Sequence, residues 1–369
     1  MRITEITVFS YTAHYSRGVF SMSNGRSSTG HPSLVIRIRT DKGIEGWAKN
    51  APLGSSYLPS TYTGELAALE ELCPQVLGLD PRSPAVITAK LDLAMMSGMA
   101  AKSIIDIACW DILGKSVGLP THVLLGGCLS EAPPAFSVVG VDDIPVAVQK
   151  AKNEHANGTL ALQLKIGNDP VADAKRIRAI RLALPESVYC FADANANWNL
   201  AEALVYARAL GQDITVPFEQ PCRTIADCAK VAQLTGLPVI LDESIYTVAD
   251  LVEAHAGGIT GVNIKLSRVG GMTKARIMRD TAAALGMSIN VDDSWGCALT
   301  TAQNLQIASS TPPKLLGAVD CYAEWTHPLI ADVPRVQADG RARPSQLPGN
   351  GFGAINADLL GEPLLSFIE

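Results

Sequence analysis

Five ionisable side chains recur at regular spacing through the middle of the chain, and together they could carry out chemistry. They are Lys165, Asp193, Glu219, Asp242 and Lys265. The intervals are 28, 26, 23 and 23 residues, and each residue closes a short apolar run that is typical of a buried strand. Burying such a group without a partner is costly, so it usually serves a site. Each interval fits one strand plus one helix, so a parallel barrel would direct all five side chains to one mouth.

The three carboxylates in this set suit a hard divalent cation. Asp193 lies in F-A-D-A-N, Glu219 in P-F-E-Q-P and Asp242 in I-L-D-E-S, and none of the six histidines ends a predicted barrel strand. Ligand sets made only of oxygen favour Mg²⁺ over zinc, which prefers histidine and cysteine. One acid alone would be interpreted as a helix cap or a salt-bridge partner. Three in register predict a magnesium site.

The two lysines flank the carboxylates in sequence. Lys165 and Lys265 fall on the second and sixth predicted barrel strands, which lie on opposite sides of an eight-stranded barrel. This arrangement suits removal of a proton beside a carboxylate, because Mg²⁺ on the substrate carboxylate would stabilise the charge that develops. A desolvated lysine beside a dication has a lowered pKa and can act as a base near neutral pH. Taken singly, either lysine could instead form a structural salt bridge.

Composition limits the class of protein. The 369 residues are 47% hydrophobic and 18% charged, with a net charge of -6 and no long basic run, which excludes disorder and argues against nucleic acid or an anionic membrane as partner. The eight scattered cysteines are typical of buried free thiols in a reducing compartment. Without a signal-like apolar segment or membrane span, we expect a cytoplasmic homo-oligomer that acts on a small molecule.

The first 125 residues predict an α+β domain. Strands are indicated at 2–10, 33–40 and 44–48, and helices at 64–79, 84–95 and 98–117. Two long loops, Tyr15–Pro32 and Ala51–Thr63, are rich in Ser, Gly or Pro and lack periodicity. Two such loops in one small domain are unusual without a function.

After residue 126, strands and helices alternate. Strands are predicted at 135–140, 161–166, 188–193, 214–219, 238–242, 260–265, 287–292 and 316–320. Helices are predicted at 143–156, 169–184, 199–211, 224–235, 246–256, 271–285 and 298–310. The pattern indicates an α/β fold with a modified TIM-type (β/α) barrel over 126–330, in which one helix is lost or altered. A doubly wound open sheet is the alternative, but it lacks its G-x-G-x-x-G fingerprint. Residues 331–369 are expected to return to the N-terminal domain.

Several motifs carry a family resemblance. Lys165, Asp193-Ala194-Asn195, E-Q-P, D-E-S and N-I-K-L-S-R-V-G-G resemble the enolase superfamily, and within it the muconate-lactonising-enzyme subgroup. The resemblance implies a catalytic barrel and an N-terminal capping domain whose two loops close over the mouth. It also implies that Mg²⁺ binds the three carboxylates and that Lys165 and Lys265 are the acid and base. One departure is Gln163, which replaces the first lysine of the subgroup's K-x-K.

Side chains near the predicted mouth suggest a substrate. Carboxylates could pair with a substrate ammonium and aromatic rings could stack on it, although a helix cap for Asp292 and a core position for Trp295 remain alternatives. The candidate substrate-binding residues are Tyr57, Asp292, Asp293, Trp295 and Glu324. The pattern is similar to that of subgroup members that act on proline derivatives. This implies dehydration of cis-3-hydroxy-L-proline to Δ1-pyrroline-2-carboxylate, with competing 2-epimerisation. Two alternatives remain open: a racemase or epimerase of proline betaines, N-acylamino acids or dipeptides, and a non-catalytic binding barrel.

Overall fold

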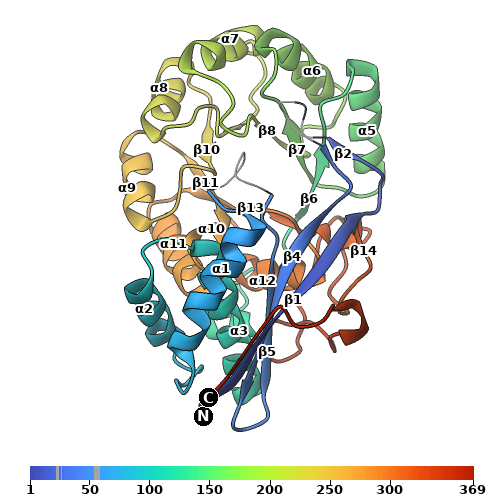
Figure 1. Cartoon of the computed structure of the whole chain (residues 1–369). Coiled ribbons are helices and arrows are strands. Elements are labelled where there is room, and N and C mark those ends of the chain that lie inside the picture. Colours follow the sequence, from blue (N-terminus) through green and yellow to red (C-terminus); the bar gives the residue numbers. More distant parts are fainter. Residues whose placement is uncertain (22–24, 26, 54–58) are drawn as a thin grey trace.

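The structure is a computed structural model that describes residues 1–21, 25, 27–53 and 59–369. Figure 1 shows a barrel of strands surrounded by helices, and beside it a strand-rich part that carries both ends of this sequence. The barrel is closed by eight strands that follow one another from β6 to β13, and neighbouring strands are parallel. This confirms the predicted TIM-type barrel with a capping part.

The barrel elements follow the predicted limits closely. The strands are β6 (Ala135–Val139), β7 (Ala161–Lys165), β8 (Tyr189–Asp193), β9 (Phe218–Glu219), β10 (Val239–Leu241), β11 (Gly261–Lys265), β12 (Ser288–Asp292) and β13 (Leu316–Asp320). The helices are α5 (Ile144–Ala156), α6 (Pro170–Leu182), α7 (Leu200–Leu210), α8 (Ile225–Thr235), α9 (Val248–Ala256), α10 (Leu266–Val269), α11 (Met272–Ala284) and α12 (Ala298–Ser309). Only β9 is clearly shorter than predicted, because Pro217 has no N–H to contribute to a strand ladder.

The last β/α unit is altered. Among the described residues, β13 is followed by the 3₁₀ turn η2 (Tyr322–Trp325) instead of an α-helix. The chain then passes through β14 (Thr326–His327) and crosses to the strand-rich part. The loss of this helix leaves that side of the barrel to be covered by other segments.

Strand register brings the predicted site residues to one end of the barrel. Lys165 pairs in register with Asp193, and Asp193 pairs with Glu219. Lys265 pairs with Asp292 on the next strand. Because side chains alternate along a strand, the residues two positions earlier also point inward. Gln163 and Asn263 are such residues, so two buried amides lie beneath the layer of charges.

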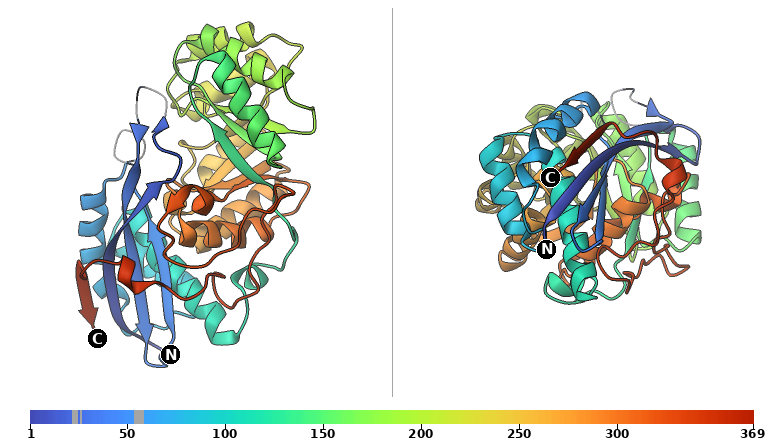
Figure 2. Two further views of the ribbon diagram at one scale, coloured as in Figure 1. Left: turned by 90° about the vertical axis from the view of Figure 1, so that its right-hand side faces the viewer. Right: turned by 60° about the horizontal axis from the view of Figure 1, so that its bottom comes forward.

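The strand-rich part is an antiparallel sheet in the order β14-β1-β4-β5, and β15 also pairs with β1. Its long strands are β1 (Ile3–Tyr15), β4 (Gly30–Thr40) and β5 (Glu45–Asn50), and β15 (Leu365–Ile368) comes from the other end of the sequence. Its helices are α1 (Tyr62–Leu72), η1 (Cys73–Val76), α2 (Pro84–Ala94), α3 (Met99–Val117) and α4 (Thr121–Leu124). In the left view of Figure 2 this part stands at one side of the barrel.

The first predicted loop is shorter than expected. β1 continues to Tyr15 and β4 begins at Gly30, and the connection between them includes the short pair β2 (Phe20–Ser21) and β3 (Ser27–Ser28). The Tyr15 ring packs on Phe20 at 5.4 Å and on Trp295 at 6.1 Å. Aromatic packing therefore extends the strand into a stretch whose Ser- and Gly-rich composition predicted an irregular loop.

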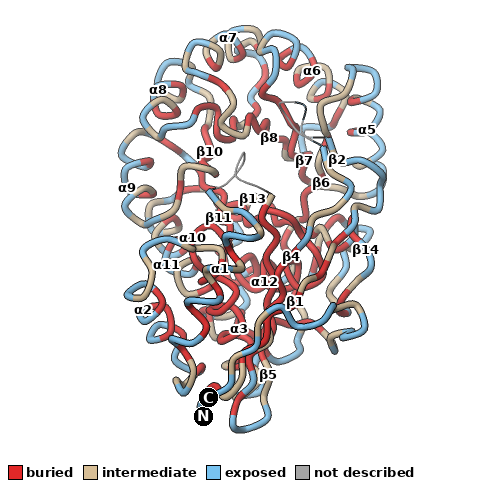
Figure 3. Tube along the Cα trace, in the orientation of Figure 1, coloured by how far each residue is buried: buried red, intermediate tan, exposed pale blue. Residues whose placement is uncertain are grey.

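Two buried helices join the parts. α12 is buried along its whole length, and α3 has thirteen buried residues; Figure 3 shows the buried trace concentrated where these helices meet the sheet. β5 approaches α3 so closely that a Cβ on Gly46 would lie 2.1 Å from the Ala108 carbonyl oxygen, so glycine is required there. Of the helices that the structure describes, none is long and apolar enough to cross a membrane.

Candidate active site

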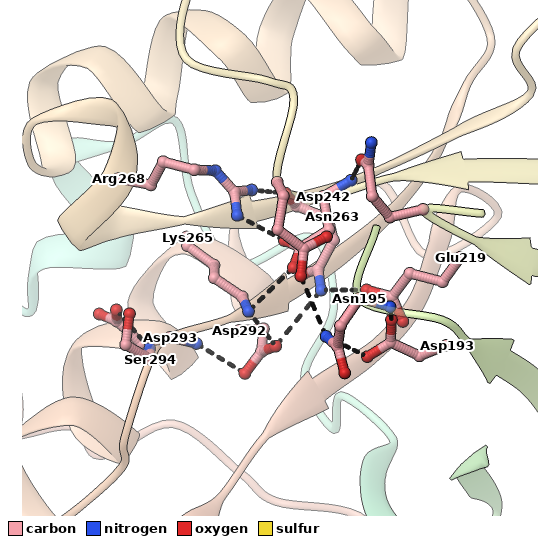
Figure 4. Close-up of polar contacts among 12 residues, drawn as sticks. Asp193, Asn195, Glu219, Asp242, Asn263, Lys265, Arg268, Asp292, Asp293 and Ser294 are labelled. Atoms are coloured by element: carbon pink, nitrogen blue, oxygen red, sulfur yellow. Dashed lines mark hydrogen bonds and ion pairs between the residues drawn. The ribbon is translucent and has the colours of Figure 1, made fainter. Parts of the chain in front are cut away.

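The five predicted ionisable residues meet at the carboxyl end of the barrel strands. Lys165 Nζ lies 2.5 Å from Asp193 Oδ2, and Lys265 Nζ lies 3.0 Å from Asp242 Oδ2. The carboxylate of Glu219 lies between these two pairs and receives hydrogen bonds from two amides, as Figure 4 shows in part. The strand-end register therefore produces a compact charged centre.

Glu219 is the most constrained carboxyl group in this centre. Its side chain is fully buried. Gln163 Nε2 donates to its Oε2 at 3.0 Å, and Asn263 Nδ2 donates to its Oε1 at 2.8 Å. Burial, followed by the charges of Asp193 and Asp242, raises the pKa of Glu219 well above its usual value. The negative charge at this point is therefore incompletely compensated by the protein.

Asp242 is held by two cations. Arg268 Nη1 lies 2.6 Å from Asp242 Oδ1, and Lys265 contacts the other oxygen. Burial alone would raise the pKa of Asp242, but these two charges outweigh burial and hold the pKa below its usual range. Arg268 also donates to the Asn263 carbonyl oxygen at 2.6 Å, so it fixes strand β11 as well.

The carboxylates around Lys165 favour its protonated form. Burial lowers the pKa of its ammonium, but the carboxylates of Asp193 and Glu219 outweigh burial and raise the pKa above its usual value. Lys265 also lies close enough to oppose this increase. A cation that took up the charge of the carboxylates would remove this effect and would favour a neutral Lys165, the form that a base requires.

The donor set fits a hard cation, although no ready-made metal cluster of His, Cys, Asp or Glu is found within the described ranges. Among the described residues, buried carboxyl groups outnumber buried cations at this mouth, six to four. The carboxyl groups are those of Asp193, Glu219, Asp242, Asp292, Asp293 and Asp320, and the cations are Lys49, Lys165, Lys265 and Arg268. All six offer oxygen, as does the half-buried Glu243, whose pKa is raised to about 8 by burial and by the charges of Asp242 and Asp193. An excess of crowded oxygen ligands suits Mg²⁺.

Asp292, a predicted substrate-binding residue, contacts Lys265 and also lines the small cavity between the two lysines. Its Oδ2 lies 3.2 Å from Lys265 Nζ, and its Oδ1 accepts the Asp293 backbone N–H at 2.7 Å. Burial, followed by the Asp292 charge, raises the pKa of Asp320 well above its usual value. Asp320 Oδ2 has no donor facing it, so a proton on Asp320 would supply the missing hydrogen bond to Asp292. Asp292 is thus already engaged by the protein.

A small cavity opens between the two lysines. Its lining includes Lys165 and Lys265, together with Asp293, Trp295 and Tyr322. Both lysines therefore reach the same space, whose remaining wall is partly acidic and partly aromatic. This is the arrangement needed for a ligand to contact both lysines at once.

The other predicted substrate-binding residues differ in their positions. The Trp295 indole Nε1 donates to the Ala13 carbonyl oxygen at 3.1 Å, so this tryptophan both packs in the interface and lines the cavity. Glu324 is not brought to the cavity: it is exposed and accepts the Val336 N–H at 3.3 Å, because it lies on the outer side of turn η2. Tyr57 lies outside the described residues.

Three residues of the site were not predicted as site residues from the sequence. Asn195 donates to Asp193 Oδ2 at 2.9 Å and to Glu243 Oε1 at 3.0 Å. Arg268, described above, binds Asp242. Asn195 and Arg268 both lie in motifs that carry the family resemblance, so those motifs could have indicated them. Lys49 comes from β5 in the other part of the molecule, and no spacing within the barrel could have indicated it.

The protonation of His31 gives a measurable test of the electrostatics where the strand-rich part meets the barrel. Its ring contacts Trp295 at 4.8 Å, and burial, followed by the charge of Lys49, lowers its pKa to about 4. An unfolded histidine protonates near pH 6.5, so the folded state loses stability relative to the unfolded state as the pH falls from 6.5 towards 4. Because the ring is only partly buried, we expect this loss to be about 1 kcal/mol at pH 5.

Urea unfolding of the wild type and of His31→Gln at pH 7.5 and pH 5 would measure this difference. The wild type should lose more stability than the variant on acidification, since the other titratable groups are common to both proteins. His255→Gln, which changes an exposed histidine near the end of α9, is the matched control and should behave as the wild type. An identical pH dependence in wild type and His31→Gln would contradict the prediction.

The chain matches two family models that together account for both parts of the fold. Residues 5–126 match the mandelate racemase / muconate lactonizing enzyme N-terminal domain, and residues 146–356 match the enolase C-terminal domain-like family. The protein therefore belongs to the enolase superfamily and is an enzyme of that class.

Particular relatives are similar along the whole chain. The chain is 37% identical to the cis-3-hydroxy-L-proline dehydratase of Roseibium aggregatum, with all of both chains covered. It is 29% identical to the N-succinyl-L-Arg/Lys racemase of Bacillus cereus, with 98% of each covered. A crystal structure of a family member from Roseovarius nubinhibens, complexed with magnesium, matches with a TM-score of 0.95 at 32% identity over all of both chains.

Proposed function

We propose that this protein removes the proton α to a substrate carboxylate with the help of Mg²⁺, and that it dehydrates cis-3-hydroxy-L-proline to Δ1-pyrroline-2-carboxylate. The observation that carries the proposal is the cavity reached by Lys165 and Lys265 together, next to three carboxylates. The full-length similarity to a dehydratase of this substrate supports the choice of reaction.

In this proposal Asp193, Glu219 and Asp242 hold the metal. Their oxygen-only donors and the uncompensated charge at Glu219 support this assignment. Mg²⁺ bound there would stabilise the negative charge that develops on the substrate carboxylate when the α-proton leaves. Structural neighbours in the family are crystallised with magnesium, which agrees with this choice of cation.

The two lysines move the protons. One lysine takes the α-proton as the C–H bond breaks. The electron pair then forms the C2=C3 double bond while the C3–O bond breaks, and the departing hydroxyl takes a proton from the enzyme and leaves as water. The enamine that remains tautomerises to Δ1-pyrroline-2-carboxylate. If the opposite lysine returns a proton to C2 before the hydroxyl leaves, the result is 2-epimerisation.

The wall of the cavity would recognise the ring and its ammonium group. Asp293 offers a carboxyl group, and Trp295 and Tyr322 offer aromatic surface. An aromatic face attracts a cation, and the attraction is larger where water is excluded. These residues thus suit a small, apolar ring with a positive charge.

A second function is favoured by a larger cavity beside the first. A cavity of about 720 Å³ lies between the barrel and the strand-rich part, which is called the sheet part from here on, and Ser294 lines both cavities. Its lining includes Glu65, Met99 and Tyr246. The distal part of an N-acylamino acid or a dipeptide could occupy it, which would make the protein a racemase or epimerase that uses the same lysines. The racemase among the relatives supports this alternative.

Incubation in D₂O with Mg²⁺ would decide between these functions. With cis-3-hydroxy-L-proline, NMR should show loss of the hydroxyl, formation of the pyrroline and deuterium at the α-carbon of the recovered substrate. L-Proline is the matched control, because it offers the same α-proton without a leaving group. If hydroxyproline shows neither exchange nor elimination while N-succinylamino acids or dipeptides gain α-deuterium, the protein is an epimerase and the dehydratase proposal is wrong.

A further inference from the structure

Lys49 is a charged residue of the sheet part that the proposed chemistry does not use. It lies near the end of β5, and its side chain is 1% exposed. Its Nζ donates a hydrogen bond to the carbonyl oxygen of Trp295, in the loop that follows barrel strand β12. A buried ammonium group is costly unless it is paired, so this contact between two parts of the molecule requires an explanation.

The surroundings of Lys49 are mainly acidic. The titratable groups that face it are the carboxyl groups of Asp293, Asp320 and Glu65 and the thiol of Cys297. His31 also senses this charge, because burial and then the charge of Lys49 lower the pKa of its ring. These acids come from β13, the β12–α12 loop and α1, and their charges favour the ammonium form of Lys49, but burial outweighs them and lowers its pKa. These acids belong to both parts of the molecule.

The loop that Lys49 contacts forms one wall of the cavity between the catalytic lysines. Asp293, Ser294 and Trp295 all line that cavity, and Figure 4 shows the first two beside Lys265. Asp293 is fixed within the loop, because Ser267 Oγ donates to its Oδ1 and the Ser294 N–H does so at 2.8 Å. Lys49 supplies a contact to the backbone of this loop from outside the barrel.

Trp295 is fastened to the sheet at two points. Its indole Nε1 donates to the Ala13 carbonyl oxygen on β1 at 3.1 Å, and its own carbonyl oxygen accepts from Lys49 on β5. The first contact sets the position of the ring and the second sets the backbone. Loss of the second contact would leave the indole hydrogen bond and the ring contacts with Tyr15 and His31, but would release the backbone of Trp295 from β5.

We propose that Lys49 is a positioning residue that holds Asp293 and Trp295 in the orientation that receives the substrate's ammonium group and ring. Lys49 does not touch substrate. It gives the capping sheet control over substrate affinity, while proton transfer at Lys165 and Lys265 proceeds without it. The choice of ligand rests on the proposed function, but the positioning of Trp295 does not.

The test is Lys49→Met, which removes the ammonium group and retains an unbranched apolar side chain. We expect KM for the hydroxyproline to rise about tenfold or more while kcat changes less than about threefold, because the ground-state wall is disturbed and the lysines are not. The matched control is Lys102→Met. Lys102 is another buried lysine of the sheet part, and it contacts Asp92 at 2.9 Å, on α2. The Lys102→Met variant should lose stability without a change in KM.

A second measurement is independent of turnover. Acrylamide quenching of tryptophan fluorescence, compared between each protein and its Trp295→Phe derivative, isolates the accessibility of Trp295. Lys49→Met should make Trp295 more accessible, whereas Lys102→Met should not. If the wild type turns over none of the substrates, the proposed function fails, but the quenching comparison still decides whether Lys49 positions Trp295.

Three outcomes would overturn the inference. These are an unchanged KM and unchanged quenching in Lys49→Met, a fall in kcat without a change in KM, and an equal rise in KM in the Lys102 control. Should Lys49→Met fail to fold, Lys49→Gln replaces it in the same measurements. Its amide can still donate to the Trp295 carbonyl oxygen but carries no charge, and we expect a smaller rise in KM from it.

Discussion

Replacement of Lys165 by alanine is expected to lower turnover by about 10²- to 10⁴-fold, which is the usual contribution of a general acid or base. Lys165 and Lys265 reach one cavity from different strands, so each should serve one face of the α-carbon. In D₂O, Lys165→Ala should therefore lose α-deuterium exchange from one face of the substrate, and Lys265→Ala should lose it from the opposite face. Separate assays with the L and D isomers of proline would distinguish the faces.

The control for this pair is Lys274→Ala. Lys274 lies on α11 and forms a salt bridge with Asp92 at 2.8 Å, away from the cavity. The Lys274→Ala variant should exchange the α-proton of both isomers at the wild-type rate. Full activity in Lys165→Ala would remove Lys165 from the mechanism. Loss of exchange from both faces in each single variant, with the fold intact by circular dichroism, would show that the lysines act as one unit.

Glu219→Gln is expected to weaken Mg²⁺ binding by at least about 100-fold, and to lower activity correspondingly. Changing a residue that only supports a metal ligand typically weakens metal binding by about 10- to 100-fold, and Glu219 is proposed as a ligand itself. The substitution keeps the shape of the side chain but removes a fully buried negative charge. Calorimetric titration with Mg²⁺ after treatment with EDTA measures the first effect, and a turnover assay at several Mg²⁺ concentrations measures the second.

A matched acid is Glu186, which is exposed just before β8 and lies at the opposite end of that strand from Asp193. Glu186→Gln should bind Mg²⁺ as the wild type does. Calorimetry that shows equal Mg²⁺ affinity for wild type and Glu219→Gln would exclude Glu219 as a ligand. If the wild type itself does not bind Mg²⁺, the proposed metal site is wrong.

The barrel could be predicted because its signals are local and repeated. Each strand is a short apolar run and each helix has its own periodicity, so their limits agree with the structure to within two residues except at β9. The convergence of Lys165 and Asp193 with the other strand-end residues follows from the same repeat, since parallel strands place their carboxyl ends at one edge. The family resemblance rests on motifs at these positions.

What could not be predicted depends on contacts between distant segments. Asp292 stands at a strand end like Asp242, but the sequence does not reveal that Lys265 on the neighbouring strand would engage it. Glu324 follows the last strand closely, yet turn η2 directs it outward. The contact of Lys49 with Trp295 joins residues 246 positions apart, and no periodic pattern encodes it.

The pairing of β15 with β1 determines when the capping sheet can be completed. Glu5 lies opposite Ile368 in that antiparallel pair, so strands from the two ends of this sequence are neighbours. While the ribosome is still making the barrel, β1 has already been synthesised. One edge of β1 then lacks its partners β14 and β15, which are made later. During translation this edge is open to other strands, and contacts of such long sequence separation form slowly. The sheet that helps to shape the cavity is therefore among the last parts of the molecule to be finished.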